Sequence, residues 1–128
     1  MSCFWTSLFS RGLFHDCKEV TCARDIIPYL KKHNTRAPII VNGNLLREKQ
    51  MTENIDAITE LKDSYFCNGY WTSTSDPVLC LLSFLTNTHV IHEWHLTPKV
   101  TIVYSPLKDI ENNTKKIIHL HSDRGHAW

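Results

Sequence analysis

One apolar stretch constrains the fold more than any other feature of this sequence. Residues 78–85 (VLCLLSFL) carry almost no polar side chain. Asp76 and Pro77 precede the stretch, and proline is common in the first turn of a helix, so we expect a helix over 76–85 with Ser75 as its N-cap. A helix that is apolar all round must be buried on every side. The rest of the chain must therefore enclose it.

Two further helices are expected before this stretch. Asp25 can cap a helix over 26–33, which places Pro28 in the first turn, where its missing N–H is tolerated. Thr52 can cap a helix over 53–62, in which apolar side chains spaced by three residues form one face. These amphipathic helices would pack against the buried one.

Strand patterns are concentrated in the second half of the chain. The short apolar run 38–41 ends at Asn42-Gly43, a pair typical of turns, and the later segments alternate or are β-branched. Helices come early and strands come late, which predicts an α+β fold with a mostly antiparallel sheet. The expected strands are residues 38–41, 70–71, 89–96, 100–104 and 116–121.

Composition excludes several classes of partner. The 128 residues are 42% hydrophobic and 21% charged, which is typical of one compact globular domain. A net charge of +1 gives no electrostatic basis for binding nucleic acid or an anionic membrane surface, and no apolar run is long enough to span a bilayer. We therefore expect neither nucleic acid nor a membrane as partner. The oligomeric state does not follow from the sequence.

The N-terminus and the cysteines indicate the compartment. Residues 1–14 (MSCFWTSLFSRGLF) are apolar but lack the basic start of a signal peptide, so we expect a helix or strand packed on the domain. The five cysteines are odd in number and none form a C-x-x-C pair, which favours free thiols in a reducing, cytoplasmic environment. A Cys17–Cys22 disulfide is the alternative.

A resemblance to a known family rests on residues 69–76 (GYWTSTSD). This segment resembles the Ser-Thr-Ser motif of arginine-type mono-ADP-ribosyltransferases, in which an aromatic residue precedes the motif and a buried helix follows. The order of elements over 26–120 is similar too: a strand ending before Gly43 lies upstream, and two strands joined by a proline bend lie downstream. The resemblance implies a single ADP-ribosyltransferase-like domain over 1–128, with an apolar segment (1–24) before a core (25–121).

The resemblance also assigns candidate site residues. It implies that NAD is the substrate, that the motif's first serine, Ser73, lies near the nicotinamide ribose, and that ADP-ribose passes to a protein side chain. The family's arginine aligns with Asn42, and its two glutamates align with Thr114 and Lys116. Glu111 is the remaining candidate for the catalytic carboxylate. The implied NAD-binding residues are Asn42, Gly43, Ser73, Thr74 and Ser75.

These departures predict a weakened or inactive transferase. Breaking the nicotinamide–ribose bond develops positive charge on the sugar, which a carboxylate stabilises, as in glycoside hydrolysis. Lys116 would reverse the sign of the field there, and Asn42 lacks the charged fork with which arginine grips phosphate. A non-enzymatic protein-interaction module is therefore an alternative function, and the acceptor and partner remain open.

The histidines and cysteines suggest two other types of site. His119 and His121 are two apart on a strand and share a face, so a third ligand such as His89, Asp123 or His126 would complete a zinc site. We expect exposed or hydrogen-bonded histidines instead, and no metal. A papain-like cysteine hydrolase would use Cys80 or Cys67 with His126.

Overall fold

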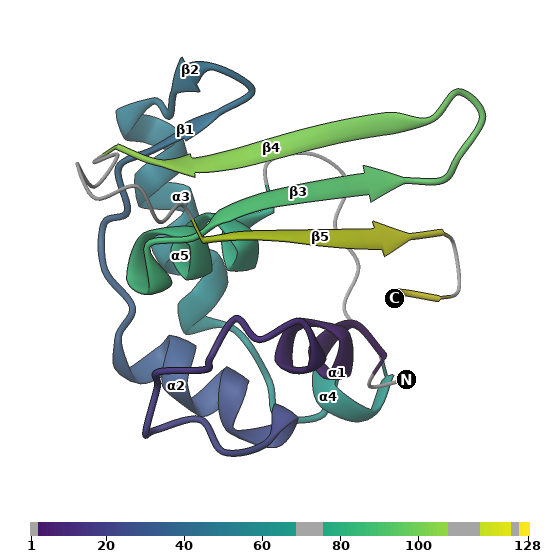
Figure 1. Cartoon of the computed structure of the whole chain (residues 1–128). Coiled ribbons are helices and arrows are strands. Elements are labelled where there is room, and N and C mark those ends of the chain that lie inside the picture. Colours follow the sequence, from purple (N-terminus) through teal and green to yellow (C-terminus); the bar gives the residue numbers. More distant parts are fainter. Residues whose placement is uncertain (1–2, 69–75, 108–115, 124–125) are drawn as a thin grey trace.

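A computed structural model describes residues 3–68, 76–107, 116–123 and 126–128 (Figure 1). Within these ranges the helices all lie before residue 87, and the three longest strands follow them. The elements are α1 (Cys3–Ser10), η1 (Ala23–Asp25), α2 (Ile26–Lys32), β1 (Ile39–Val41), β2 (Asn44–Leu45), α3 (Glu48–Thr59), α4 (Tyr65–Asn68), α5 (Pro77–Thr86), β3 (His89–Trp94), β4 (Val100–Pro106) and β5 (Ile117–Ser122).

The strands form one five-stranded sheet in the order β2-β1-β4-β3-β5. Three of the neighbouring pairs are antiparallel, and only β5 runs parallel to its neighbour β3. The α+β class and the mostly antiparallel sheet are therefore confirmed. Three of the expected strands match β3, β4 and β5, and the run 38–41 matches β1, whereas residues 70–71 lie outside the described residues.

Helix α5 is buried as its composition predicts. Five consecutive residues, 78–82, are at most 2% exposed, and the helix packs on the sheet and on α3 (Figure 1). The expected cap was wrong by one residue: the carboxylate of Asp76, not Ser75, accepts a hydrogen bond of 2.8 Å from the Val78 N–H. Asp76 precedes Pro77, which occupies the first turn, so its side chain is placed to reach the next free N–H. At the other end, Asn87 has φ of 50° and closes the helix.

The three long strands bury every second side chain. On β3, Val90, His92 and Trp94 are buried, while the residues between them are partly exposed. The register places Val90 between Tyr104 of β4 and Ile118 of β5. These three buried side chains form a row across the strands on the face of the sheet that α5 covers. The opposite face carries the alternate side chains, including the acidic and histidine residues discussed below.

The N-terminal segment packs into the core, as expected. Helix α1 buries Phe4, Trp5 and Leu8, and the indole Nε1 of Trp5 donates to the backbone oxygen of Tyr65 at 3.3 Å. This bond joins α1 to α4, which lies beside it in Figure 1. The hydrophobic core therefore continues without a break from this segment into the rest of the domain.

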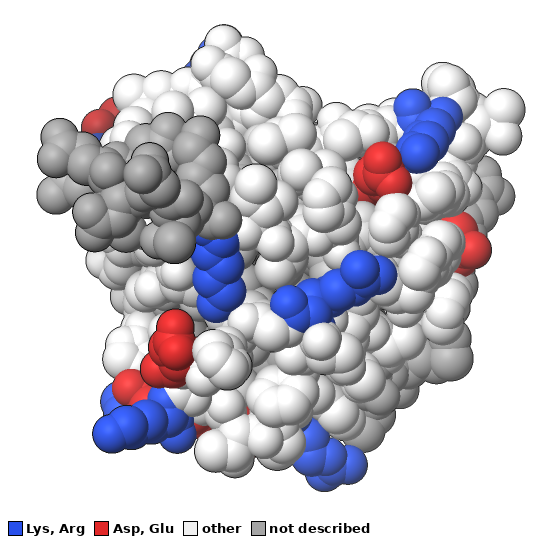
Figure 2. All heavy atoms as spheres, in the orientation of Figure 1, with Lys and Arg blue, Asp and Glu red and all other residues white. Residues whose placement is uncertain are grey.

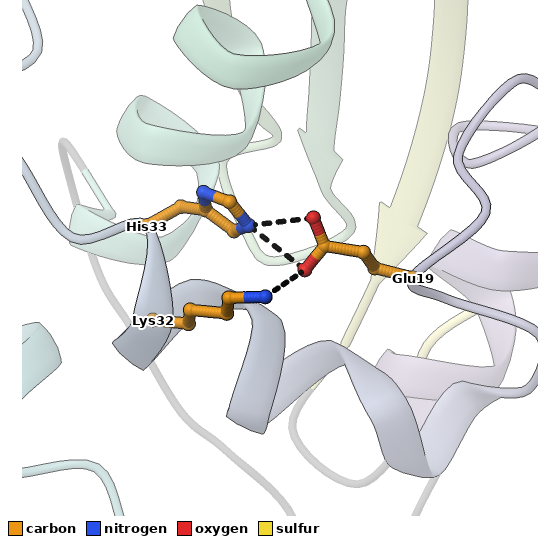
Figure 3. Close-up of polar contacts among 3 residues, drawn as sticks. All are labelled: Glu19, Lys32 and His33. Carbon is orange, nitrogen blue, oxygen red and sulfur yellow. Dashed lines mark hydrogen bonds and ion pairs between the residues drawn. The ribbon is translucent and has the colours of Figure 1, made fainter.

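A polar cluster holds the first loop against the end of α2 (Figure 3). Both carboxylate oxygens of Glu19 lie within hydrogen-bond distance of His33 Nε2 (3.0 and 2.9 Å), and Lys32 Nζ lies 3.1 Å from one of them. The hydrogen bond from His33, and then that from Lys32, lower the pKa of Glu19. Glu19 and Lys32 are exposed to solvent and His33 is partly exposed, so the cluster positions the loop more than it stabilises the fold.

Helix α2 begins at Ile26, as predicted, but its cap and the start of α3 differ from the sequence predictions. Asp25 does not cap α2 with its side chain, because its carboxylate accepts hydrogen bonds from Thr21 and Cys22 and closes the preceding turn η1. Helix α3 begins at Glu48, so Thr52 lies inside it and its hydroxyl donates back to the Glu48 carbonyl at 3.2 Å. In both cases the side chain bonds to a backbone group upstream of it rather than to a free N–H in the first turn of the expected helix. The spacing of residues in the sequence does not distinguish these two possibilities.

Charges are interspersed on the face drawn in Figure 2, where acidic and basic side chains lie singly or beside one another. Among the described residues, no helix combines the length and the apolar character needed to span a bilayer.

Candidate functional site

The Asn42-Gly43 pair forms the turn between β1 and β2. Both residues have positive φ (49° and 83°), the arrangement that a two-residue hairpin requires and that Asn-Gly adopts most readily. The Asn42 side-chain oxygen accepts a hydrogen bond of 2.7 Å from the Val103 N–H, and the Asn42 N–H donates to the Val103 carbonyl at 2.9 Å. Asn42 therefore ties the turn to β4, and a ligand here would meet its Nδ2 rather than its oxygen.

A surface hollow of about 440 Å³ lies beside this turn. It runs along the hairpin to the start of α3, so it joins the turn to the N-terminus of a twelve-residue helix. Arg47, the residue before that helix, lines the hollow, and its side chain makes no cap to the first N–H groups of α3. The lining residues are Val41, Asn42, Asn44, Leu45, Leu46, Arg47 and Gln50.

Most of the expected catalytic and NAD-binding residues cannot be placed. Ser73, Thr74, Ser75 and Glu111 lie outside the described residues. The adjoining residue, Asp76, donates its backbone N–H to the hydroxyl of Tyr104 at 2.9 Å.

That hydrogen bond relates the position of Asp76 to that of the turn. Tyr104 lies on β4 directly opposite Val41 of β1, which immediately precedes Asn42. Asp76 therefore lies at the tip of the buried Tyr104 side chain, under the face of the sheet that α5 covers, whereas Asn42 bonds to the backbone of the adjacent residue, Val103.

Lys116 lies away from the Asn42–Gly43 turn and its hollow. Its ammonium donates to the backbone oxygen of Leu13 at 2.7 Å, and it precedes β5, which is separated from β1 by two strands. Burial lowers the pKa of Lys116, whereas Asp16 and then Cys17 act in the opposite direction. The positive charge that the sequence placed in the cleft is thus directed toward the N-terminal segment.

A second group of polar side chains meets on the sheet face opposite α5. His119 and His121 share that face, as expected, but His121 is met by Glu93 and His95 rather than by the partners considered from the sequence. Glu93 pairs with His121 across the parallel β3–β5 register, and His95 follows two residues later. His89 pairs at the far end of the strand, opposite Ile117.

The donor atoms of this group are close together. His121 Nδ1 lies 2.9 Å from His95 Nε2 and 3.0 Å from Glu93 Oε2. His95 Nε2 and Glu93 Oε2 are 3.8 Å apart. Sequence reasoning missed the group because it depends on which strands are neighbours. The spacing of Glu93 and His95, two apart on one strand face, was the available signal.

Charges around the group bias its protonation. Burial raises the pKa of Glu93, but Lys99, 3.4 Å from its other oxygen, and the two histidines together hold that pKa below its usual value. Burial lowers the pKa of His121, against the opposing effect of Glu93. At neutral pH the group therefore contains an ionised carboxylate and a neutral His121 imidazole.

Cys80 offers no support for the cysteine-hydrolase alternative. It is fully buried inside α5, and burial followed by the charge of Asp76 raises the pKa of its thiol to about 12. A thiol in this environment stays protonated and is a poor nucleophile. Cys3, Cys17, Cys22 and Cys80 are free thiols, so no Cys17–Cys22 disulfide forms, and the side chain of Cys67 lies outside the described atoms.

Comparison of the chain with models of protein families, with curated proteins and with solved structures finds no significant match.

Proposed function

We propose that this chain is an ADP-ribosyltransferase-like protein that binds NAD in the hollow beside the Asn42–Gly43 turn and transfers ADP-ribose weakly or not at all. The observation that carries the proposal is the position of Arg47, which lines the same hollow as Asn42. A volume of about 440 Å³ falls within the usual range of ligand pockets.

Arg47 can supply the charge that Asn42 lacks. The resemblance implies that an arginine at the Asn42 position would hold the NAD phosphates, and Arg47 stands five residues later on the other side of the hairpin. A guanidinium binds a phosphate through two hydrogen bonds. The start of α3 adds backbone N–H groups and the positive end of a helix dipole at the same place. A diphosphate is therefore the part of NAD that this hollow suits best.

The proposal places the nicotinamide end toward Ser73. The hydrogen bond between Asp76, which follows the motif in sequence, and Tyr104, which pairs with Val41 of β1, supports this placement. Glu111 remains the proposed carboxylate for any residual transfer. Since the glutamate positions hold Thr114 and Lys116, the developing positive charge on ribose would receive less stabilisation than in the family. Slow or absent transfer follows from that loss.

Binding is tested by the melting temperature of the full chain with and without NAD. A ligand that binds only the folded state raises the melting temperature, by an amount that grows with its concentration relative to Kd. We expect the shift to disappear in Arg47→Ala and to persist in Lys49→Ala, which removes an exposed cation from the first turn of α3, outside the hollow. The absence of a shift in the unmodified chain would refute NAD binding.

Transfer is tested separately with labelled NAD and a protein lysate. Label incorporated by the unmodified chain but lost in both Ser73→Ala and Glu111→Gln would establish an active transferase. An NAD-dependent shift without any incorporation would identify a binding protein that has lost the reaction. Incorporation that survives both substitutions would exclude the assigned catalytic residues.

A protein-interaction module is the second candidate, favoured by the sheet face opposite α5. Ile91 and Val103 are paired on that face and only half-buried, and Ile117 on β5 is 48% exposed. A partner that co-precipitates with the chain, fails to bind Ile117→Glu and still binds Lys49→Ala would support this function. Such binding in a chain that shows no NAD shift would favour it over the first candidate.

A further inference from the structure

We propose that Glu93, His95 and His121 form a binding site for a divalent transition metal, with zinc as the expected ion. The site is independent of the NAD hollow, because its ligands lie on β3, on the residues after it and on β5, whereas the hollow is formed by the β1–β2 hairpin and α3. One ligand atom from each residue lies within 4.8 Å of the others.

Hydrogen bonds satisfy this arrangement only in part. His121 Nδ1 carries either one proton or one lone pair, and it lies within 3.0 Å of both His95 Nε2 and Glu93 Oε2. As a lone pair it accepts from His95 but faces a carboxylate oxygen that has no proton to give. As an N–H it must share a single proton between Glu93 Oε2 and a lone pair on His95 Nε2, or else face an N–H of His95. A cation between the three atoms satisfies all of them together.

The distances suit an ion of the size of zinc. A triangle with sides of 2.9, 3.0 and 3.8 Å has a circumscribed radius of roughly 1.9 Å, so an ion just above its plane can lie about 2.0–2.1 Å from all three atoms. Two imidazole nitrogens and a carboxylate oxygen are a donor set that zinc accepts with a fourth position open to water. Calcium and magnesium prefer oxygen ligands, so the two histidines argue against them.

Neighbouring residues hold the ligands in position. Lys99 lies 3.4 Å from the second oxygen of Glu93, which leaves Oε2 directed toward the histidines. Trp128 stacks on the His121 ring with centroids 5.5 Å apart and planes 11° from parallel, and its ring centre lies 5.1 Å from that of His95. The Trp128 backbone also exchanges two hydrogen bonds with His121, of 2.9 and 2.8 Å. Supporting contacts of this kind fix the orientation of metal-bound side chains.

The ligands are also accessible to an ion from solvent. The side chains of Glu93, His95 and His121 are 24%, 35% and 25% exposed, so each is fixed on one side and open on the other. Exchange of a bound ion with solution requires no opening of the core.

Zinc binding to the full chain is measured by equilibrium dialysis and by isothermal titration, after treatment with a chelator. We expect one zinc per chain and a loss of affinity of about tenfold or more in each of Glu93→Gln, His95→Gln and His121→Gln, since even substitutions around a metal's ligands have effects of this order. The control is His119→Gln, an exposed histidine on the same strand and face, which should bind as the unmodified chain does.

Cobalt provides a second readout that does not depend on affinity. Co²⁺ in a four-coordinate site gives strong visible absorption, whereas six-coordinate Co²⁺ on surface histidines gives very weak bands. We expect the strong bands in the unmodified chain and in His119→Gln only. Melting without metal verifies that each variant is folded. No stoichiometric zinc binding, binding that survives all three ligand substitutions, or equal loss in His119→Gln would overturn the proposal, and none of these results bears on NAD binding.

Discussion

The hydroxyl of Tyr104 is predicted to contribute to stability through one buried hydrogen bond. Tyr104 is fully buried, and its oxygen accepts the Asp76 N–H at 2.9 Å at the point where the chain enters α5. Burial, and then the charge of Asp76, raise the pKa of Tyr104 far above its usual value, so the hydroxyl stays neutral. In Tyr104→Phe the ring remains and the Asp76 N–H is left in the core without this acceptor.

The size of the effect follows from that lost acceptor. A buried donor deprived of its partner costs about 1–3 kcal/mol in the free energy of unfolding. For 128 residues, an unfolding entropy of roughly 2.1 cal/mol/K per residue corresponds to about 0.27 kcal/mol/K. The melting temperature of Tyr104→Phe should therefore fall by about 4–11 °C.

The assay combines thermal melting with urea unfolding at pH 7. The matched control is Tyr29→Phe, which removes a hydroxyl from a tyrosine that is only partly buried, where a change within about 0.5 kcal/mol is expected. Hydrogen exchange at the Asp76 amide should accelerate in Tyr104→Phe and not in Tyr29→Phe. Equal melting temperatures for Tyr104→Phe and the unmodified chain, with the Asp76 amide still protected, would refute the reasoning.

Three further predictions follow from the same core. Asp76→Ala removes the cap on α5 and should lower the free energy of unfolding by about 1–2 kcal/mol, measured in urea, whereas Asp76→Asn, which keeps a capping oxygen, should lose less. Trp5→Ala should cost about 3–5 kcal/mol, because the indole is fully buried; a smaller loss would mean that α1 is only loosely packed. The pKa of Cys80 is raised to about 12 in the folded chain, whereas an unfolded thiol ionises near 8.5, so stability should fall as pH rises above about 8.5, by up to about 1.4 kcal/mol per pH unit from this group. Unfolding midpoints between pH 8 and 10 test this slope, which should be shallower in Cys80→Ala.

The sequence was most informative where one segment determines its own environment. The apolar run 78–85 can exist only inside the molecule, and β-branched or alternating segments such as 100–104 suit only a sheet, so α5 and the long strands were predictable. The Asn42-Gly43 turn was predictable for the same reason, because both residues tolerate the left-handed backbone that a tight hairpin needs.

Features that depend on distant partners were not predictable in this way. The side-chain cap of α2 and the start of α3 were mispredicted because Asp25 and Thr52 satisfy backbone groups other than the expected ones. The Glu93–His95–His121 group depends on β5 lying parallel to β3, and no local pattern in either strand specifies that pairing. The orientation of Lys116 toward Leu13 likewise depends on where the N-terminal segment packs.

The position of β5 has a kinetic consequence for a bound metal. Strands β3 and β4 are neighbours in sequence and can pair early through a short connection, whereas β5 adds to the edge only after a longer closure, which argues for its late docking. The proposed ligands lie on both sides of the β3–β5 pairing, with Glu93 and His95 on the β3 side and His121 on β5. An ion held there would slow the release of β5 and prolong the lifetime of the native chain, while leaving the rate at which the chain first folds nearly unchanged.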